Sequence, residues 1–309
     1  MNKIIVILGQ TSTGKSDFAV EVAKNINGEI ISADSRQVYK GMNLGTGKIT
    51  KKEMWGIPHY LLDITSPSRV FSVSDFQKLA NKKIKEILEK GKTPIICGGT
   101  GFYIDSIINR TIFPEVPPNK KLREILERKT TEKLLEILKK IDKNRAQNID
   151  QKNRIRLIRA IEIVKTLGKV PSLSPRPCLG EDKYLKIGLT MPPEVLKERI
   201  KTRLLIRIKK GMIKEVENLH NQGVSWKRMN ALGLEYRYVS NYLKDSKTMP
   251  PLKLRQAKKE MIEKLNTEIW HYAKRQKTWF KRDFNTIWID PRKKSEKNKA
   301  LKEIKRFLK

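Results

Sequence analysis

Short apolar runs alternate with amphipathic stretches in the first third of the chain. Residues 3–8 form a β-branched run that ends at a glycine, which is typical of a buried strand. Phe18, Val22 and Ile26 then recur at helical spacing, and residues 29–32 have strand character again. The pattern predicts a strand, a helix and a second strand in that order.

The same alternation continues after residue 70. Residues 72–75 (Ser-Val-Ser-Asp) form a capping box that predicts the start of a helix, and Gly91 predicts its end. Residues 93–97 predict a further buried strand, which the glycine-rich segment 98–101 follows. Because strands alternate with helices, we expect an α/β fold with a parallel sheet flanked by helices and joined by right-handed crossovers.

The middle of the chain departs from this alternation. Residues 114–184 contain amphipathic helical stretches at 122–128, 132–141 and 153–167. The prolines that mark the two ends of this segment are Pro114, Pro117, Pro118, Pro171, Pro175 and Pro177. The sequence therefore predicts an all-helical domain at 114–184, inserted into a discontinuous core of residues 1–113 and 185–309.

The C-terminal part returns to the mixed pattern of the core. Residues 185–191 predict a strand, residues 193–219 a helical region, and residues 288–290 a last short strand. The residues after Pro291 predict either an amphipathic helix or a frayed end.

Composition adds a strong basic bias to this picture. The 309 residues contain 67 Lys and Arg against 33 Asp and Glu, which gives a formal net charge of +34. Such a charge favours a polyanionic partner, since each phosphate that a Lys or Arg neutralises releases counterions. A general lysine bias of the genome explains the composition equally well.

Cysteine, histidine and hydropathy patterns exclude several classes of protein. Two distant cysteines, Cys97 and Cys178, and three scattered histidines argue against a disulfide framework or a zinc site. The longest apolar run is far too short to cross a bilayer. We expect a cytoplasmic protein that does not enter membranes.

Residues 9–16 (Gly-Gln-Thr-Ser-Thr-Gly-Lys-Ser) match the phosphate-binding pattern G-x-x-x-x-G-K-[ST] between a predicted strand and a predicted helix. Its glycines allow backbone N–H groups to surround phosphate oxygens, and the helix N-terminus adds its dipole. Lys15 would neutralise terminal phosphates, and Ser16 would help to hold Mg²⁺. The alternative is a glycine turn without a ligand.

Two further segments lie where parallel sheets place their ligands, at the carboxyl ends of strands. Asp34 follows the second predicted strand and is a candidate general base or metal ligand; the simpler alternative is a helix N-cap. Thr100 lies in the glycine-rich segment and is a candidate hydrogen-bond donor to a reacting oxygen; the alternative is a turn that caps the next helix.

A P-loop kinase would need an acidic strand end and an arginine lid. Asp63 is the only weak candidate for the first, and Arg154, Arg156 and Arg159 imitate the second, although their spacing also suits a solvated basic helix face. Residues 270–282 interleave aromatic and basic side chains, which suits base stacking and equally suits a core helix.

Taken together, these segments resemble the tRNA dimethylallyltransferase family. The resemblance covers most of the chain and rests on residues 9–16, on Asp-Ser-Arg-Gln-Val-Tyr at 34–39, on Gly-Gly-Thr-Gly at 98–101 and on Tyr-Ala-Lys-Arg-Gln at 272–276. It implies a P-loop NTPase-like fold and transfer of a dimethylallyl group from dimethylallyl diphosphate to N6 of the adenosine that follows the anticodon. The inserted domain would then clamp the tRNA anticodon stem-loop. Mg²⁺ would be the cofactor. The enzyme is expected to be a monomer.

The resemblance also implies roles for individual residues. Asp34 would be the general base, and Thr100 would donate to the oxygen that bridges the allyl group and the diphosphate, with Lys15 and Arg203 completing the catalytic set. The residues implied to bind diphosphate are Gly9, Thr11, Ser12, Thr13, Gly14, Lys15, Ser16 and Arg203, with Ser16 also on the metal. The residues implied to bind tRNA are Asp34, Ser35, Arg36, Gln37, Thr100, Arg123, Ile155, Arg156, Arg159, Lys274 and Arg275.

The chain departs from the family pattern at a few positions. Gln10 stands where proline is common, Ile269 and Trp270 stand where Thr-Arg is usual, and Arg207 replaces an apolar residue. Two other functions stay open at this point. One is transfer of the same group to AMP or ADP, and the other is a P-loop kinase or nucleic-acid-binding NTPase.

Overall fold

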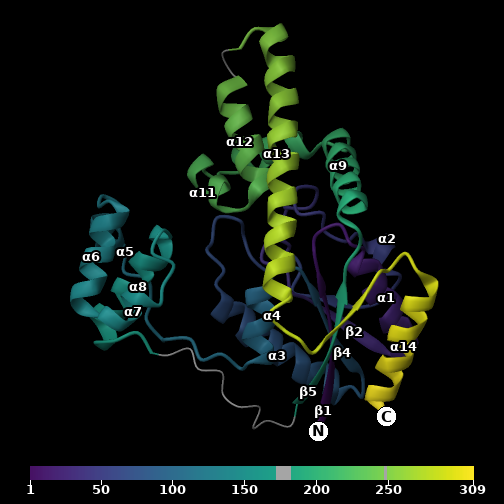
Figure 1. Cartoon of the computed structure of the whole chain (residues 1–309). Coiled ribbons are helices and arrows are strands. Elements are labelled where there is room, and N and C mark those ends of the chain that lie inside the picture. Colours follow the sequence, from purple (N-terminus) through teal and green to yellow (C-terminus); the bar gives the residue numbers. More distant parts are fainter. Residues whose placement is uncertain (172–181, 247–248) are drawn as a thin grey trace. The chain divides into compact units, whose positions relative to one another are not determined.

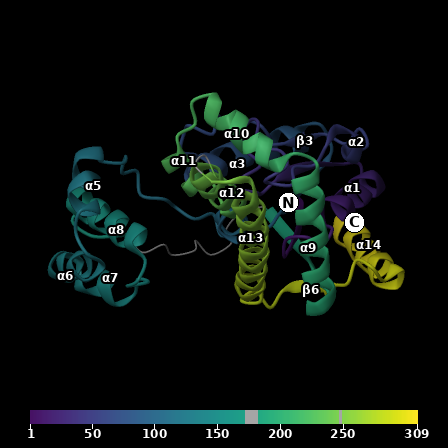
Figure 2. The same ribbon diagram turned by 90° about the horizontal axis from the view of Figure 1, so that it is seen from above.

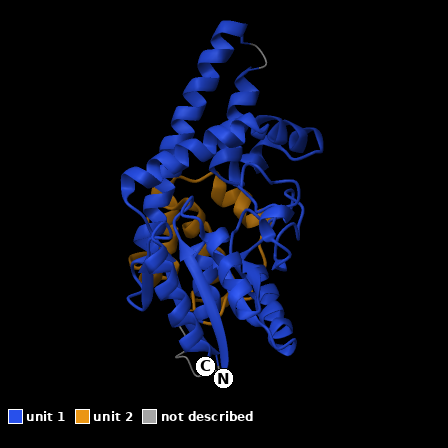
Figure 3. Cartoon of the chain, turned by 90° about the vertical axis from the view of Figure 1, so that its right-hand side faces the viewer, with its two compact units in different colours: residues 1–109, 178–309 blue, residues 110–177 orange. Residues whose placement is uncertain are grey.

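The computed structural model describes residues 1–171, 182–246 and 249–309, and it divides the chain into two compact units (Figure 3). Unit 1 comprises residues 1–109 and 178–309, and unit 2 comprises residues 110–177. Cys178, Pro175 and Pro177 lie outside the described residues. Each unit has its own buried apolar core and is described by itself.

A six-stranded parallel sheet forms the centre of unit 1, with strand order β3-β2-β4-β1-β5-β6 (Figure 1). The strands are β1 (Asn2–Gly9), β2 (Gly28–Ser32), β3 (His59–Tyr60), β4 (Thr93–Gly98), β5 (Asp182–Leu189) and β6 (Thr286–Ile289). The parallel α/β sheet predicted from the alternation is thereby confirmed. β1 lies between β4 and β5, so the loop that follows β1 emerges in the middle of the sheet edge.

Strand β5 begins three residues earlier than the predicted residue 185. Asn2 opens β1 and pairs in register with Asp182, and the Asn2 side chain donates a hydrogen bond to Asp182 Oδ1 at 2.8 Å. This pairing extends the strand over polar residues that carry no apolar signal.

Helices cover both faces of the sheet (Figure 1, Figure 2). Ile5 and Ile7 pack with α1 (Lys15–Ile26) and α14 (Lys294–Leu308), which confirms a helix for the C-terminal tail. The alternate β1 residues face α3 (Val73–Glu89) and α4 (Gly101–Ile108). The capping box predicted for α3 is present, because Ser72 and Asp75 bond to each other's backbone N–H groups.

A third apolar cluster in unit 1 is built by helices above the sheet edge in Figure 1. These helices are α9 (Pro193–Lys209), α10 (Met212–Asn221), α11 (Trp226–Ala231), α12 (Leu234–Ser246) and α13 (Pro251–Phe280). The helical region predicted at 193–219 is two helices, since Gly211 adopts a φ of +99°, which a helix cannot accommodate. A short helix, α2 (Lys51–Met54), precedes β3. None of the helices in the described ranges has the length and apolar character that crossing a bilayer requires.

Unit 2 consists of helices around the cluster of Leu134, Leu138, Leu157 and Ile161. Its helices are α5 (Lys120–Glu127), α6 (Thr131–Ile141), α7 (Lys143–Gln147) and α8 (Arg154–Leu167). The three predicted helices are present. The short α7 was not predicted, because five residues with one buried side chain show no periodicity.

A buried carboxylate holds unit 2 together. Glu162 is 1% exposed; it accepts two hydrogen bonds from Arg123, one from Arg159 and one from the backbone of Asn119, each at 2.7–2.8 Å. Burial alone would raise the pKa of Glu162, but the hydrogen bonds from the two arginines and Asn119 outweigh it and lower that pKa. The carboxylate therefore joins α5 to α8 in its charged form.

We expect Glu162→Ala to lower the free energy of unfolding by about 3 kcal/mol, because two half-buried guanidinium groups lose their counter-charge. Urea denaturation of the full chain measures the loss, and hydrogen exchange over residues 119–164 locates it. Glu136→Ala in the same unit removes only an exposed pair with Lys133 and should change little. Equal stability of the two variants would contradict the role of Glu162.

Candidate active site

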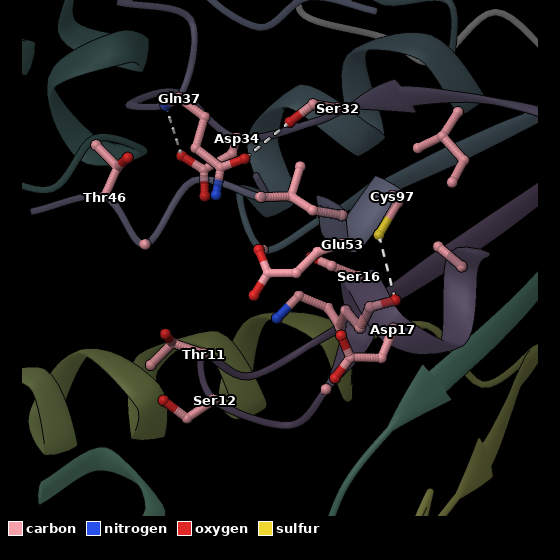
Figure 4. A pocket seen from close by; sticks show the side chains of 18 of the residues that line it. Thr11, Ser12, Ser16, Asp17, Ser32, Asp34, Gln37, Thr46, Glu53 and Cys97 are labelled. Atoms are coloured by element: carbon pink, nitrogen blue, oxygen red, sulfur yellow. Dashed lines mark hydrogen bonds between the residues drawn. The ribbon is translucent and has the colours of Figure 1, made fainter. Parts of the chain in front are cut away.

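Three loops meet at the carboxyl edge of the sheet in unit 1. They follow β1, β2 and β4, and they line a common cavity of about 270 Å³ together with residues of α9. Figure 4 shows Asp34 and Gln37 on one side of this pocket and Thr11 and Ser12 on the opposite side. The convergence expected from a parallel sheet is present, because the carboxyl ends of parallel strands share an edge.

The loop at residues 9–16, called the phosphate loop below, has a backbone that few side chains permit. Gly9 has a φ of +142°, and a Cβ there would lie 2.4 Å from the carbonyl oxygen of Leu189. Gly14 has a φ of +87° and caps α1. Thr13 Oγ1 donates to the carbonyl oxygen of Gln10 at 2.8 Å and closes the turn. The glycines therefore serve the loop's shape as the motif predicts.

Lys15 is a half-buried cation that lines the pocket. Its Nζ donates to the carbonyl oxygen of Gln10 at 2.6 Å. Burial lowers the pKa of Lys15 to about 8; Cys97 and Asp34 oppose this shift, and Arg203 adds to it. Among the described residues no carboxylate forms an ion pair with Lys15, so a bound anion would supply its missing counter-charge.

The Asp34 carboxylate caps a turn. Its Oδ1 accepts the backbone N–H groups of Arg36 at 2.8 Å and Gln37 at 3.3 Å, and the residues that follow form no helix. The N-cap alternative is therefore wrong for Asp34. Both bonds use the same oxygen, and the carboxylate lines the pocket.

Thr100 occupies the N-cap position of α4, but its side chain makes no cap bond. Its Oγ1 instead accepts the N–H of Ser35 at 3.1 Å and lies 3.4 Å from Ser35 Oγ. The loops after β2 and β4 are thus joined directly. Since the 3.4 Å contact is weak, the hydroxyl proton of Thr100 is available to a ligand.

Three arginines on α9 have a spacing of four and so share one face of the helix. Arg199 donates to the carbonyl oxygen of Ser12 at 3.0 Å, and Arg203 lines the pocket. Desolvation and the charges of Arg207 and Arg199 lower the pKa of Arg203. Sequence reasoning singled out Arg203 and missed Arg199, although the spacing of four was a usable signal.

The three departures from the family pattern have partners in the structure. Gln10 donates its side-chain amide to the carbonyl oxygen of Ala273 in α13 at 3.1 Å. Arg207 donates to the carbonyl oxygen of Gly45 at 2.9 Å and pairs with Glu235 at 3.3 Å. Trp270 lies beneath the ammonium groups of Lys197 and Lys274, at 5.1 and 5.8 Å from its ring centre.

The residues expected to bind RNA differ in their exposure and in whether other residues of the protein already bind their side chains. Lys274 and Arg275 are exposed on α13, and Ser35, Arg36 and Gln37 are half-buried after β2. In unit 2, Ile155 is 81% exposed and Arg156 is exposed, which suits contact with a partner. Arg123 and Arg159 are bonded to Glu162 instead, so any contact of theirs with RNA would use a pre-positioned guanidinium. Their assignment to RNA stays a prediction.

The pocket offers few ligands for a metal ion. Ser16 is exposed in the first turn of α1, and Asp17 and Glu53 line the same cavity. Within the described part of the chain, no cluster of three or more His, Cys, Asp or Glu side chains is arranged to hold a metal. The donor set fits Mg²⁺ held by the Ser16 hydroxyl together with water and substrate oxygens, as is usual for this ion. Asp63, the acidic strand end considered for a kinase, pairs with Lys48 at 2.5 Å.

The chain matches a family of known enzymes along most of its length. The family model described as IPP transferase matches residues 37–283. The chain is 44% identical to "tRNA dimethylallyltransferase 2" of Treponema denticola over 90% of this chain and 91% of that protein. It is 39% identical to the tRNA dimethylallyltransferase of Acetivibrio thermocellus over 100% of this chain and 98% of that protein.

Solved structures agree with the sequence relatives. The full-length tRNA isopentenylpyrophosphate transferase of Bacillus halodurans superposes with a TM-score of 0.70 at 35% identity, covering 100% of this chain and 96% of that one. A eukaryotic dimethylallyltransferase described as acting on tRNA superposes with a TM-score of 0.73 at 25% identity, covering 90% of this chain and 70% of that one.

The lowered pKa of Lys15 predicts a pH dependence of anion binding. Because only the protonated amine attracts the anion, the affinity for inorganic pyrophosphate should fall as pH rises through about 8, by about tenfold per pH unit well above it. Calorimetric titrations from pH 7 to 10 measure this. Lys15→Met is the control, since it removes the titrating group and leaves only the pH dependence of pyrophosphate itself. An affinity ratio between the two proteins that stays constant with pH would contradict the assignment.

Proposed function

The chain belongs to the IPP transferase family, and on that basis we propose that it transfers a dimethylallyl group from dimethylallyl diphosphate to N6 of an adenosine in tRNA. The adenosine is the one 3′-adjacent to the anticodon, in tRNAs that read codons beginning with U. Diphosphate is released. The observation that carries this proposal is the pocket lined by the phosphate loop and the Asp34 carboxylate, with Thr100 bonded to the backbone of the residue after Asp34. Relatives of nearly the same length carry the name tRNA dimethylallyltransferase, which supports the same reaction.

The phosphate loop serves the leaving group in this proposal. Breaking the allylic C–O bond leaves positive charge on carbon and adds negative charge to the diphosphate. Backbone N–H groups of the phosphate loop after Thr11, together with Lys15 and Arg203, are the groups that stabilise this charge as it grows. Mg²⁺, when held by Ser16 and the diphosphate, would add Lewis-acid stabilisation of the same charge.

Asp34 and Thr100 serve the two reacting centres. An adenine amine is a poor nucleophile, and the Asp34 carboxylate, whose Oδ2 is not used by the turn, would accept its proton as the new C–N bond forms. Thr100, held by the Ser35 backbone, would donate a hydrogen bond from its hydroxyl to the bridging oxygen of the diphosphate. The 3.1 Å hydrogen bond between the two loops fixes the position of the Asp34 loop relative to the Thr100 hydroxyl.

The acceptor reaches the pocket as an extruded base, because an adenine within the stacked anticodon loop is out of reach. The net charge of +34 supports a nucleic-acid acceptor. Lys274 and Arg275 on α13, together with Ile155 and Arg156 in unit 2, are the exposed residues that we assign to RNA contacts. The helical insertion is assigned to clamping the anticodon stem-loop, and the enzyme is assigned to the cytoplasm as a monomer.

The product identifies the reaction. Incubation with dimethylallyl diphosphate, Mg²⁺ and tRNA should add a C5H8 mass to one adenosine beside the anticodon, as measured by nuclease digestion and mass spectrometry. AMP, ADP and ATP are offered in parallel reactions. Modification of a free nucleotide instead of tRNA, or phosphoryl transfer from ATP, would overturn the proposal in favour of the other two functions.

Asp34→Asn should lower kcat by about 10²- to 10⁴-fold, because the amide cannot accept the proton, while tRNA affinity stays near that of the native protein. Single-turnover transfer and filter binding measure the two quantities separately. Asp245→Asn on the exposed part of α12 is the matched control. A fully active Asp34→Asn protein would remove this carboxylate from the mechanism.

A further inference from the structure

One buried side chain joins two of the three loops of the pocket. Gln276 lies on the inner face of α13 and is 6% exposed. Its Oε1 accepts the backbone N–H of Thr11 in the phosphate loop at 2.8 Å. Its Nε2 donates to the carbonyl oxygen of Gly99, next to Thr100, at 2.7 Å. The two loops are thus connected through a single amide group.

An amide side chain meets the chemical requirement of this connection. One loop presents a donor and the other an acceptor, so the bridging group needs both functions at its tip. A carboxylate lacks the donor, and an ammonium group lacks the acceptor. The fit is close, since a Cβ on Gly99 would lie 2.5 Å from Gln276 Nε2. The glycine after β4 is therefore matched to this side chain.

The same helix holds the phosphate loop at a second point and carries basic groups on its other side. Gln10 donates to the carbonyl oxygen of Ala273, one turn before Gln276. Lys274 and Arg275, the neighbours of Gln276 in sequence, are exposed. α13 thus contacts the anion cradle with its buried face, while the face assigned to RNA remains free.

We propose that Gln276 is a positioning residue, which sets the distance between the diphosphate cradle and the Thr100 hydroxyl and fixes both loops to α13. This role rests on the proposed function, since it concerns the leaving group of that reaction. Gln276 touches neither substrate directly. It holds the backbone of the phosphate loop at Thr11 and of the Thr100 loop at Gly99 before substrate binds, which reduces the reorganisation that the transition state requires.

Two substitutions separate positioning from packing. Gln276→Met fills nearly the same volume but removes both hydrogen bonds, whereas Gln276→Asn keeps an amide on a shorter side chain. If Gln276 only filled space, Met would resemble the native protein more closely than Asn. If it positions the loops, transfer rates rank Gln, then Asn, then Met. Misplacement by about 1 Å predicts a loss in kcat of about 10²-fold for Met.

The experiment measures kcat, KM for dimethylallyl diphosphate, Kd for inorganic pyrophosphate and Kd for tRNA, with thermal melting as a check of folding. We expect the Met variant to lose kcat and pyrophosphate affinity and to keep its tRNA affinity, because the basic face of α13 is unchanged. Gln256→Leu, an exposed glutamine on the same helix, is the matched control and should behave as the native protein.

The kcat values and pyrophosphate affinities of the two variants decide whether Gln276 positions the loops. A Met variant with native kcat and native pyrophosphate affinity overturns the positioning role, as does an Asn variant less active than Met. If the Met variant does not fold, the Asn variant decides alone, and native kcat and pyrophosphate affinity there overturn the role. If the native protein transfers no dimethylallyl group, the proposed function fails, and the pyrophosphate affinities still decide whether Gln276 holds the cradle.

Discussion

The constraint on which the pocket depends is a half-buried Lys15 that has no carboxylate ion pair in the described part of the chain. Burying an ammonium group is unfavourable, and the lowering of its pKa to about 8 records that cost. The carbonyl oxygen of Gln10 offsets part of it, and a phosphate anion would offset the rest. The loop can expose its N–H groups to the same anion because Gly9 and Gly14 adopt conformations that side chains resist.

A loop so dependent on glycine needs support from outside itself. Arg199 of α9 bonds to the Ser12 carbonyl, and α13 reaches Thr11 through Gln276 and Gln10 through Ala273. The helical cluster above the sheet is therefore part of the phosphate site. Asp34 lines the same pocket, and Thr100 holds the backbone of Ser35 beside it, so a proton acceptor and a hydrogen-bond donor lie next to the phosphate loop.

The basic residues divide into those that hold the fold and those that are free to bind. Arg123 and Arg159 neutralise the buried Glu162, and Arg207 secures the loop at Gly45. Lys274, Arg275 and Arg156 are exposed. A net charge of +34 counts both groups alike, so composition points to a polyanionic partner without saying which side chains meet it.

Local features were readable from the sequence by itself because short-range physics decides them. The β-branched run of β1, the capping box at Ser72 and Asp75 and the glycine-rich loop each depend on neighbours within a few residues. They sufficed for the α/β fold, the resemblance to a family and the convergence of Asp34 and Thr100 on one edge. The separation of α9 from α10 at Gly211 and the extension of β5 to Asp182 depend on packing and strand pairing, and the local pattern missed them. Only the tertiary structure decided that Gln276 meets Thr11, that Arg199 meets Ser12 and that Glu162 engages Arg123. The partners in these pairs lie 265, 187 and 39 positions apart in the chain, and no local pattern determines which distant groups the folded backbone brings within hydrogen-bond distance.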